Sequence, residues 1–190
     1  MNKEELIESI NRYIPYNEQE EKDKAFILDM IFKCDDIFLR DNLFAHMSAS
    51  SWIVNKDRTK TIMVYHNIFN SWSWLGGHAD GNVDLFEVAL KEAKEESGVK
   101  NIKPLSKDIY SLEVLTVNGH EKNGKYVSSH LHLNITYLLE ADENDELIIK
   151  EDENSGVKWF NLDEVIEASS EEWYKERIYP KLIDKLSLYK

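Results

Sequence analysis

The sequence is poor in the residues that mark several common classes of protein. Its 190 residues include one cysteine, three prolines and seven glycines. Because Cys34 stands alone, an intrachain disulfide and a cysteine-rich zinc site are excluded, and a reducing compartment fits. The few prolines and glycines give no compositional sign of extended disorder. Since 42% of the residues are hydrophobic, the chain can bury a sizeable core, and we expect it to fold on its own.

Positive charge is also scarce. The 23 lysines and arginines face 36 aspartates and glutamates, which gives a formal net charge of -13. Nonspecific binding to nucleic acid depends on basic residues that neutralise phosphates, so this activity is not expected. A phosphorylated substrate would require a metal ion or a local basic patch.

Long apolar runs are missing. No stretch approaches the roughly 18 consecutive apolar residues of a membrane span. The segment from Met1 to Tyr16 mixes charged and apolar residues and lacks the apolar core of a secretory signal. We therefore expect a cytoplasmic protein without a membrane partner. The sequence leaves its oligomeric state open, a homodimer included.

The hydrophobic pattern predicts a mixture of helices and strands. The predicted helices cover residues 3–13, 17–33 and 85–97, with two more from about 163 and from about 170 to the end. The predicted strands cover residues 45–54, 61–66, 110–117, 126–139 and 157–160, and the first two form a hairpin. This pattern favours an α+β or α/β fold, with a helical extension over 1–43 packed on a single globular core over 44–190. The strongly acidic segment 142–153, in which Lys150 is the one cation, is expected to be a solvated loop.

The helix over 85–97 carries three glutamates in an unusual place. On a helical wheel Glu96 falls inside the apolar arc and Glu92 lies at its edge; the arc is formed by Leu85, Phe86, Ala89, Leu90 and Ala93. Because a buried carboxylate is costly without a partner, Glu96 needs a cation, a hydrogen-bond donor or an opening to solvent. Glu92, Glu95 and Glu96 project within an arc of roughly 100°, so their charges can converge on one point. An acidic, solvated helix face is the alternative interpretation.

The surroundings of the three glutamates favour a metal site. A glycine-containing loop leads into the helix, and Gly98 ends it. Asp84 and Glu87 stand three residues apart at its start, the spacing of a capping box. Carboxylate oxygens suit Mg²⁺ or Mn²⁺ better than Zn²⁺.

From Gly77 to Val99 the sequence reads GHADGNVDLFEVALKEAKEESGV. It resembles the signature of the Nudix hydrolase family, Gly-x5-Glu-x7-Arg-Glu-U-x-Glu-Glu-x-Gly-U, in which U is a bulky apolar residue. Six positions agree without insertion: Gly77, Glu92, Glu95, Glu96, Gly98 and Val99. A looser likeness extends over about residues 44–168. The resemblance implies the family's α/β/α sandwich with a mixed sheet.

The sequence departs from the family signature at two functional positions. The family's first glutamate falls on Val83, and its arginine falls on Lys91. In the family these two residues help to fix the loop against the helix, and Asp84 is a candidate substitute. Ala93 is also small for an apolar position.

The resemblance implies that water attacks a phosphorus atom of a nucleoside diphosphate linked to another group, with Mg²⁺ or Mn²⁺ as cofactor. It assigns Glu92, Glu95 and Glu96 as metal ligands, of which Glu95 and Glu96 are also counted as catalytic. The Gly77 carbonyl is a weaker ligand candidate. Glu153, outside the signature, is the candidate general base.

Substrate contacts are expected outside the glutamate helix. His78 is a candidate for positioning phosphate. His130, His132 and Asn134 alternate along the predicted strand 126–139 and so share one face, either exposed or facing substrate. Trp72 and Trp74, and more weakly Phe69, are candidates for stacking on a base, with core packing as the alternative.

Three other interpretations compete with a hydrolase. The departures at Val83 and Lys91 suggest a noncatalytic Nudix-like binding or regulatory module, whereas the retention of all three ligand glutamates speaks against it. An isopentenyl diphosphate isomerase on the same fold expects a catalytic cysteine on a strand near the site, whereas Cys34 lies at the end of a predicted helix. The third alternative is a plain acidic helix in another fold. The sequence does not identify the diphosphate substrate.

Overall fold

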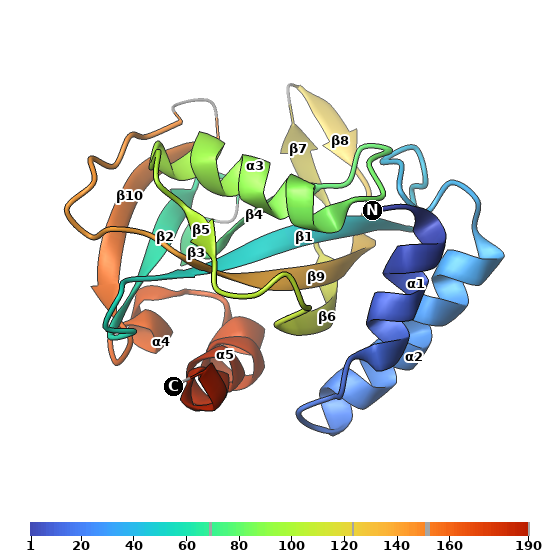
Figure 1. The fold of residues 1–190 in the computed structure, drawn as a ribbon. Coiled ribbons are helices and arrows are strands. Elements are labelled where there is room, and N and C mark those ends of the chain that lie inside the picture. Colours follow the sequence, from blue (N-terminus) through green and yellow to red (C-terminus); the bar gives the residue numbers. More distant parts are fainter. Residues whose placement is uncertain (69, 123, 151–152, 190) are drawn as a thin grey trace. The chain divides into compact units, whose positions relative to one another are not determined.

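The computed structural model describes residues 1–68, 70–122, 124–150 and 153–189 (Figure 1). The chain divides into two compact units. The first comprises Met1–Ser50, Gly76–Ala89 and Lys107–Tyr137, and the second comprises Ser51–Leu75, Leu90–Ser106 and Leu138–Lys190. Strands β1 (Ala45–Val54) and β9 (His130–Glu140) and helix α3 (Leu85–Ser97) each contribute residues to both units.

Two capped helices begin the first unit. Helix α1 (Lys3–Arg12) starts with a capping box, in which the Asn2 side chain accepts from the Glu5 N–H and the Glu5 carboxylate accepts from the Asn2 N–H, both at 2.9 Å. Helix α2 (Glu18–Lys33) starts at Asn17, whose side chain accepts from the Glu20 N–H at 3.0 Å. Both helices match the predicted ranges to within a residue at each end. Helix α2 packs against strand β6 (Ser111–Val117).

The strands of the first unit form a mixed arrangement. Strand β6 pairs antiparallel with β9, from Ser111 opposite Thr136 to Val117 opposite His130. Strand β9 also lies beside β1, and β4 (Leu75–His78) pairs with β1. The Leu131 N–H donates to the Phe44 carbonyl at 3.0 Å, and further along both strands the Ser48 hydroxyl donates to Asn134 at 3.1 Å. These contacts advance in the same direction, so β1 and β9 run parallel, and the expected combination of helices with a mixed sheet is confirmed.

The predicted long strand over 126–139 is wrong in its first part. Strand β8 (Lys125–Val127) pairs with β7 (His120–Lys122) in a separate two-stranded sheet, and β9 begins only at His130. The backbone leaves the extended ladder at Ser128 and Ser129. There the Ser129 hydroxyl accepts from the Gly119 N–H at 2.9 Å, so a side chain takes the place of a strand partner.

Strand β2 (Lys60–His66) lies at the centre of the second unit. It forms the predicted hairpin with the end of β1, and it pairs antiparallel with β10 (Asn154–Asn161) and with β3 (Ser71–Ser73). The short strand β5 (Lys103–Pro104) pairs with the end of β9. The segment that carries Trp72 and Trp74, predicted as a loop, instead contains strands β3 and β4. Phe69 lies outside the described residues.

The C-terminal helices are shorter and more broken than predicted. Helix α4 (Val165–Ala168) is followed by a π-helical turn, Tyr174–Ile178, by α5 (Tyr179–Lys185), and by a final 3₁₀ turn, Leu186–Tyr189. Pro180 lies in the first turn of α5 and has no N–H to donate to the preceding turn. The wider π turn before it accommodates this missing hydrogen bond.

Aromatic side chains close the core of the second unit. The Trp52 ring stacks on the buried Tyr179 ring with centroids 6.0 Å apart. In the described part of the chain, no helix is both long and apolar enough to cross a membrane.

Candidate active site and metal-ligating residues

Helix α3 forms over the predicted residues and places the three glutamates in three different environments. Its first turn is capped by Asp84, whose carboxylate accepts from the Glu87 N–H at 3.2 Å. Glu96 is 3% exposed, which confirms that it falls on the buried side of the helix. The side chain of Glu92 is 14% exposed and that of Glu95 is 41% exposed. The carboxylates therefore run from the protein interior to the surface along one turn.

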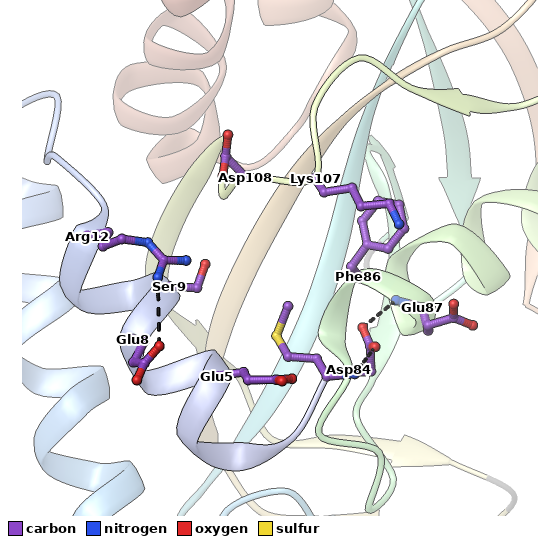
Figure 2. A pocket seen from close by; sticks show the side chains of 10 residues that line it. Glu5, Glu8, Ser9, Arg12, Asp84, Phe86, Glu87, Lys107 and Asp108 are labelled. Atoms are coloured by element: carbon purple, nitrogen blue, oxygen red, sulfur yellow. Dashed lines mark hydrogen bonds and ion pairs between the residues drawn. The ribbon is translucent and has the colours of Figure 1, made fainter.

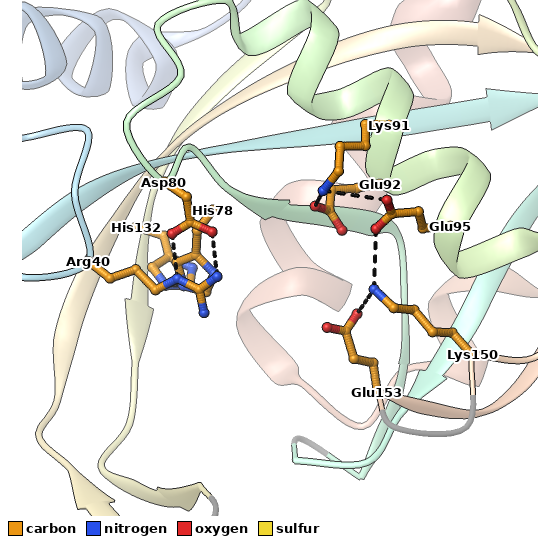
Figure 3. A network of polar contacts seen from close by, with 9 residues as sticks. All are labelled: Arg40, His78, Asp80, Lys91, Glu92, Glu95, His132, Lys150 and Glu153. Carbon is orange, nitrogen blue, oxygen red and sulfur yellow. Dashed lines mark hydrogen bonds and ion pairs between the residues drawn. The ribbon is translucent and has the colours of Figure 1, made fainter.

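Two lysines hold the outer carboxylates (Figure 3). Lys91 Nζ lies 3.3 Å from Glu92 Oε1 and 3.5 Å from Glu95 Oε1. Lys150 Nζ lies 3.4 Å from Glu95 Oε2 and 2.9 Å from Glu153 Oε2. The pKa of Lys91 is raised, mainly by the charge of Glu92. These carboxylates thus already share cationic partners, and Lys150 joins the predicted general base to the glutamate helix.

The end of α3 explains how Lys150 reaches the glutamates. Gly98 adopts a φ of +71°, which favours glycine, and a Cβ there would lie 2.5 Å from Ile148 Cβ. The Ile148 N–H donates to the Ser97 carbonyl at 2.8 Å, and the Asn154 side-chain amide donates to the Glu96 carbonyl at 3.3 Å. Part of the acidic segment 142–153 is therefore anchored to the helix end. Lys150 is evident from the sequence as that segment's one cation, but its contact with Glu95 was not predicted.

The glycine-containing loop of the first unit ends in an ion pair. Strand β4 ends at His78, and the next residue, Ala79, donates its N–H to the Met47 carbonyl at 3.0 Å. Asp80, at a φ of 48°, accepts from two nitrogens of the Arg40 guanidinium, with Nε at 2.5 Å from Oδ1 (Figure 3). The loop is therefore held by hydrogen bonds from both backbone and side chains.

Four histidines of the first unit gather beside this loop. Among the described residues, His46, His78, His130 and His132 form a group whose potential ligand atoms all lie within 4.8 Å of one another. Burial lowers the pKa of His78 to about 3, and the charge of Arg40 acts in the same direction. Burial also lowers the pKa values of His46 and His132. These three imidazoles are therefore neutral near pH 7.

Three of these histidines were predicted from the sequence as site residues, and His46 was not. The structure brings His78, His130 and His132 together, although they come from two strands far apart in the sequence. His46 alternates with Ser48 and Ser50 along β1, a polar face that offered the one available signal.

Asn134, predicted to share the face of His130 and His132, lies in a buried polar network of the first unit. It is 1% exposed and accepts from the hydroxyls of Ser48 at 3.1 Å and Ser50 at 2.9 Å. Its amide nitrogen donates to Glu113 Oε2 at 3.1 Å. This part of the face is therefore core, with its polar groups paired internally.

The two tryptophans proposed to stack on a base lie in packed surroundings. Trp72 meets Phe160 edge-on, with ring centroids 4.9 Å apart, and Lys158 Nζ lies 5.0 Å from the centre of its ring. Trp74 is 7% exposed and meets Tyr174 and Tyr179 edge-on. Both arrangements fit the core-packing alternative, and substrate stacking stays a prediction.

A separate surface hollow of the first unit contains none of the candidate catalytic, metal-ligating or substrate-binding residues. Figure 2 shows it lined by residues of α1, the first turn of α3 and the segment at Lys107 and Asp108. There the Met1 amino group pairs with Asp84 Oδ2 at 2.5 Å. Asp84 therefore serves as a helix cap and as the partner of this amino group. Cys34 lies at the C-terminal end of α2.

One comparison with known proteins identifies a family. A family model described as NUDIX domain matches residues 45–182. No curated protein sequence matches the chain.

Three solved structures share the fold at low sequence identity. An Ap4A hydrolase from C. elegans, in a binary complex, has 20% identity and a TM-score of 0.54 over 75% of this chain and 96% of its own. A NUDIX family hydrolase from Clostridium perfringens has 21% identity and a TM-score of 0.53 over 76% and 98%. A MutT protein from Methanosarcina mazei Go1 has 15% identity and a TM-score of 0.53 over 75% and 96%.

Proposed function

We propose that this chain, which belongs to the NUDIX domain family and is a pyrophosphohydrolase of that family, hydrolyses a nucleoside diphosphate linked to another group with Mg²⁺ or Mn²⁺ as cofactor. The observation that carries the proposal is the turn of α3 that bears Glu92, Glu95 and Glu96, all at the family's positions. A nucleotide-type substrate is proposed by analogy with the similar structures named as an Ap4A hydrolase and a MutT protein.

The residues of this turn fit a hard divalent cation. All the donors are carboxylate oxygens, which Mg²⁺ and Mn²⁺ prefer. Two of the three carboxylates already contact a lysine ammonium, at 3.3 to 3.5 Å. A position that gathers ammonium groups between carboxylates is electrostatically suited to a metal cation in their place.

Each residue has a role in the proposed reaction. When bound, the divalent cation neutralises charge on the pyrophosphate and orients the attacking water. Glu92, Glu95 and Glu96 hold the cation, and the burial of Glu96 restricts the motion of its carboxylate. Glu153 takes a proton from the water, and its Lys150 contact places its carboxylate beside the same ammonium that Glu95 contacts. The Gly77 carbonyl as a ligand, and Trp72 and Trp74 as substrate contacts, stay predictions.

A panel of nucleoside diphosphate derivatives tests the function. Turnover is measured as phosphate-containing products with Mg²⁺, with Mn²⁺ and with chelator alone. We expect at least one compound to be hydrolysed in a metal-dependent manner, and Glu95→Gln to reduce its turnover strongly because one ligand charge is lost. Glu87→Gln is the matched control, since Glu87 is an exposed glutamate of the same helix outside the ligand set.

Two results would count against the proposal. Binding of a panel member without turnover in either metal would favour the noncatalytic module, which the departures at Val83 and Lys91 also favour. Equal rates for wild type and Glu95→Gln would remove that glutamate from the ligand set.

A further inference from the structure

The four clustered histidines of the first unit come from three strands. His46 is the second residue of β1, His78 is the last of β4, and His130 and His132 are the first and third of β9. Side chains two apart on a strand share a face, so β9 contributes both of its imidazoles to the same side. The ring centroids of His46 lie 4.8 to 5.0 Å from those of the other three. The cluster is therefore built by the sheet rather than by a mobile loop alone.

Backbone carbonyls fix the protonation of two of these rings. His46 Nδ1 lies 3.0 Å from the Asn42 carbonyl oxygen, and His130 Nδ1 lies 2.8 Å from the Ser128 carbonyl oxygen. Because a carbonyl oxygen only accepts, each Nδ1 carries the hydrogen, and in the neutral ring each Nε2 presents a lone pair. His46 Nε2 is buried and has no hydrogen-bond partner in the described part of the chain. Its lone pair is thus left without a donor among the described residues.

The ring hydrogens of the cluster cannot satisfy all of its nitrogen–nitrogen contacts. His132 Nε2 lies 3.2 Å from His78 Nε2 and 3.2 Å from His130 Nε2. One N–H on His132 cannot point at both neighbours, and a lone pair on His132 would face the lone pair of His130. In either tautomer one nitrogen contact lacks a well-directed hydrogen. A cation between the nitrogens would satisfy all the lone pairs together.

We propose that His46, His78, His130 and His132 bind one divalent first-row transition metal ion through their Nε2 atoms. Imidazole nitrogen suits Zn²⁺, Ni²⁺ and Cu²⁺, whereas Mg²⁺ requires oxygen ligands. Nδ1–H groups that donate to backbone carbonyls are the usual outer contacts of metal-bound histidines. Because four protein ligands fill a tetrahedral zinc ion, the site is structural. His78, His130 and His132 thereby take a ligand role in place of the substrate contacts predicted from sequence.

The spacing of the nitrogens is close to that of a tetrahedral site. Zinc–nitrogen bonds of about 2.0 to 2.1 Å place tetrahedral ligands roughly 3.3 to 3.4 Å apart. Two of the nitrogen pairs are already at 3.2 Å. No separation exceeds 4.8 Å, so the nitrogens would have to approach by at most about 1.4 Å on binding, a distance that imidazole torsions span.

The nearby charges permit a cation. Arg40 and, more weakly, Lys122 are positive charges that act on His78. Both contacting nitrogens of Arg40 are engaged by the Asp80 carboxylate, which offsets the larger of the two charges. The ligands themselves contribute no charge, so the ion keeps its full double charge, as in other all-histidine sites.

Metal titration of the full-length chain without an affinity tag tests the site. The protein is stripped with a chelator, and Zn²⁺ binding is followed by calorimetry in the presence of excess Mg²⁺. We expect one equivalent of Zn²⁺ to bind, and Co²⁺ to give the visible absorption of a tetrahedral nitrogen site. His78→Ala and His130→Ala should each weaken Zn²⁺ binding at least about tenfold. The matched controls are His66→Ala and His120→Ala, which remove the two histidines outside the cluster.

The result that overturns the site is also specific. Zinc affinity that survives in both cluster variants, or that is lost in Glu95→Gln instead, would assign the ion to other ligands. X-ray absorption of the wild-type zinc complex covers the case in which an alanine variant does not fold. A first shell of nitrogen with imidazole scattering supports the proposal, and a first shell dominated by carboxylate oxygen overturns it.

Discussion

The histidine cluster of the first unit and the glutamate cluster of the second gather like groups in opposite ways. Lys91 and Lys150 offset the repulsion between the outer glutamates with contacts of 3.3 to 3.5 Å. Three of the histidines lose their charge, since burial lowers the pKa of His78 to about 3 and also lowers the pKa values of His46 and His132. The glutamates, the outer two paired with lysines, offer hard oxygen donors to a metal. The histidines that lose their charge offer neutral nitrogen donors. One chain thus presents two donor sets that differ in the metals they favour.

The largest expected effect separates the two donor sets by reaction rate. Glu96→Gln keeps the size of a side chain that is 3% exposed but removes its charge. We expect kcat/KM for the Mg²⁺-dependent reaction to fall by at least about 100-fold, because electrostatic stabilisation of the transition state is lost. Zinc binding by the histidines should stay unchanged in the same variant. A normal rate would remove Glu96 from the site, and a parallel loss of zinc would show that the two sets act as one.

Acid should destabilise the metal-free protein through the histidine cluster. In metal-free protein the folded-state pKa of His78 lies near 3, below its unfolded value of 6.5, so the unfolded chain binds the extra proton as pH falls. The stability that this neutral ring contributes is present above pH 6.5 and is lost as the pH falls towards 3. Each such group gives a slope of about 1.4 kcal/mol per pH unit. Denaturant unfolding at several pH values with chelator present, compared between wild type and His78→Gln, measures how the free energy of unfolding changes with pH. Identical slopes for the two proteins would contradict the lowered pKa of His78.

Gly98→Ala should destabilise the end of the glutamate helix. The substitution forces a φ of +71° on alanine and brings its Cβ against Ile148. We expect a loss of about 1–2 kcal/mol in the free energy of unfolding from the backbone alone, together with displacement of the segment that carries Lys150. Gly124→Ala is the control, since it also has a positive φ, of +72°, but no heavy atom within 4 Å of the added Cβ. Equal losses for the two variants would show that the Ile148 contact contributes nothing.

The glutamate helix was predictable because its signals are local. Asp84 caps it, Gly98 ends it, and the apolar arc between them sets which face is buried. Those features lie within fifteen residues, so helix geometry alone places Glu96 on the buried side. The same local pattern did not reveal the ion pairs with Lys150, which depend on where a distant segment returns to the helix.

The histidine cluster was not predictable because it depends on strand pairing. His46 and His130 are 84 positions apart in the printed sequence, and their proximity depends on β1 lying beside β9. The break before β9 was missed for a similar reason. Tyr126 and Val127 favour a strand, and the hydrogen bond from Gly119 to Ser129 that ends the ladder joins residues across a turn.

The smallest expected effect concerns Lys150, and it tests whether the lysines occupy the place of a metal. Exposed ion pairs contribute up to about 1 kcal/mol, so removing a cation that competes with Mg²⁺ should lower the activation constant for Mg²⁺ by at most about fivefold. Lys150→Ala should show this change in a titration of rate against Mg²⁺ concentration. Lys94→Ala, which removes an exposed cation from the glutamate helix α3, should leave the activation constant for Mg²⁺ unchanged. A higher activation constant in Lys150→Ala would mean that this lysine favours Mg²⁺ binding, for example by contacting substrate phosphate. Lys150 would then stay beside Glu95 when the metal is bound.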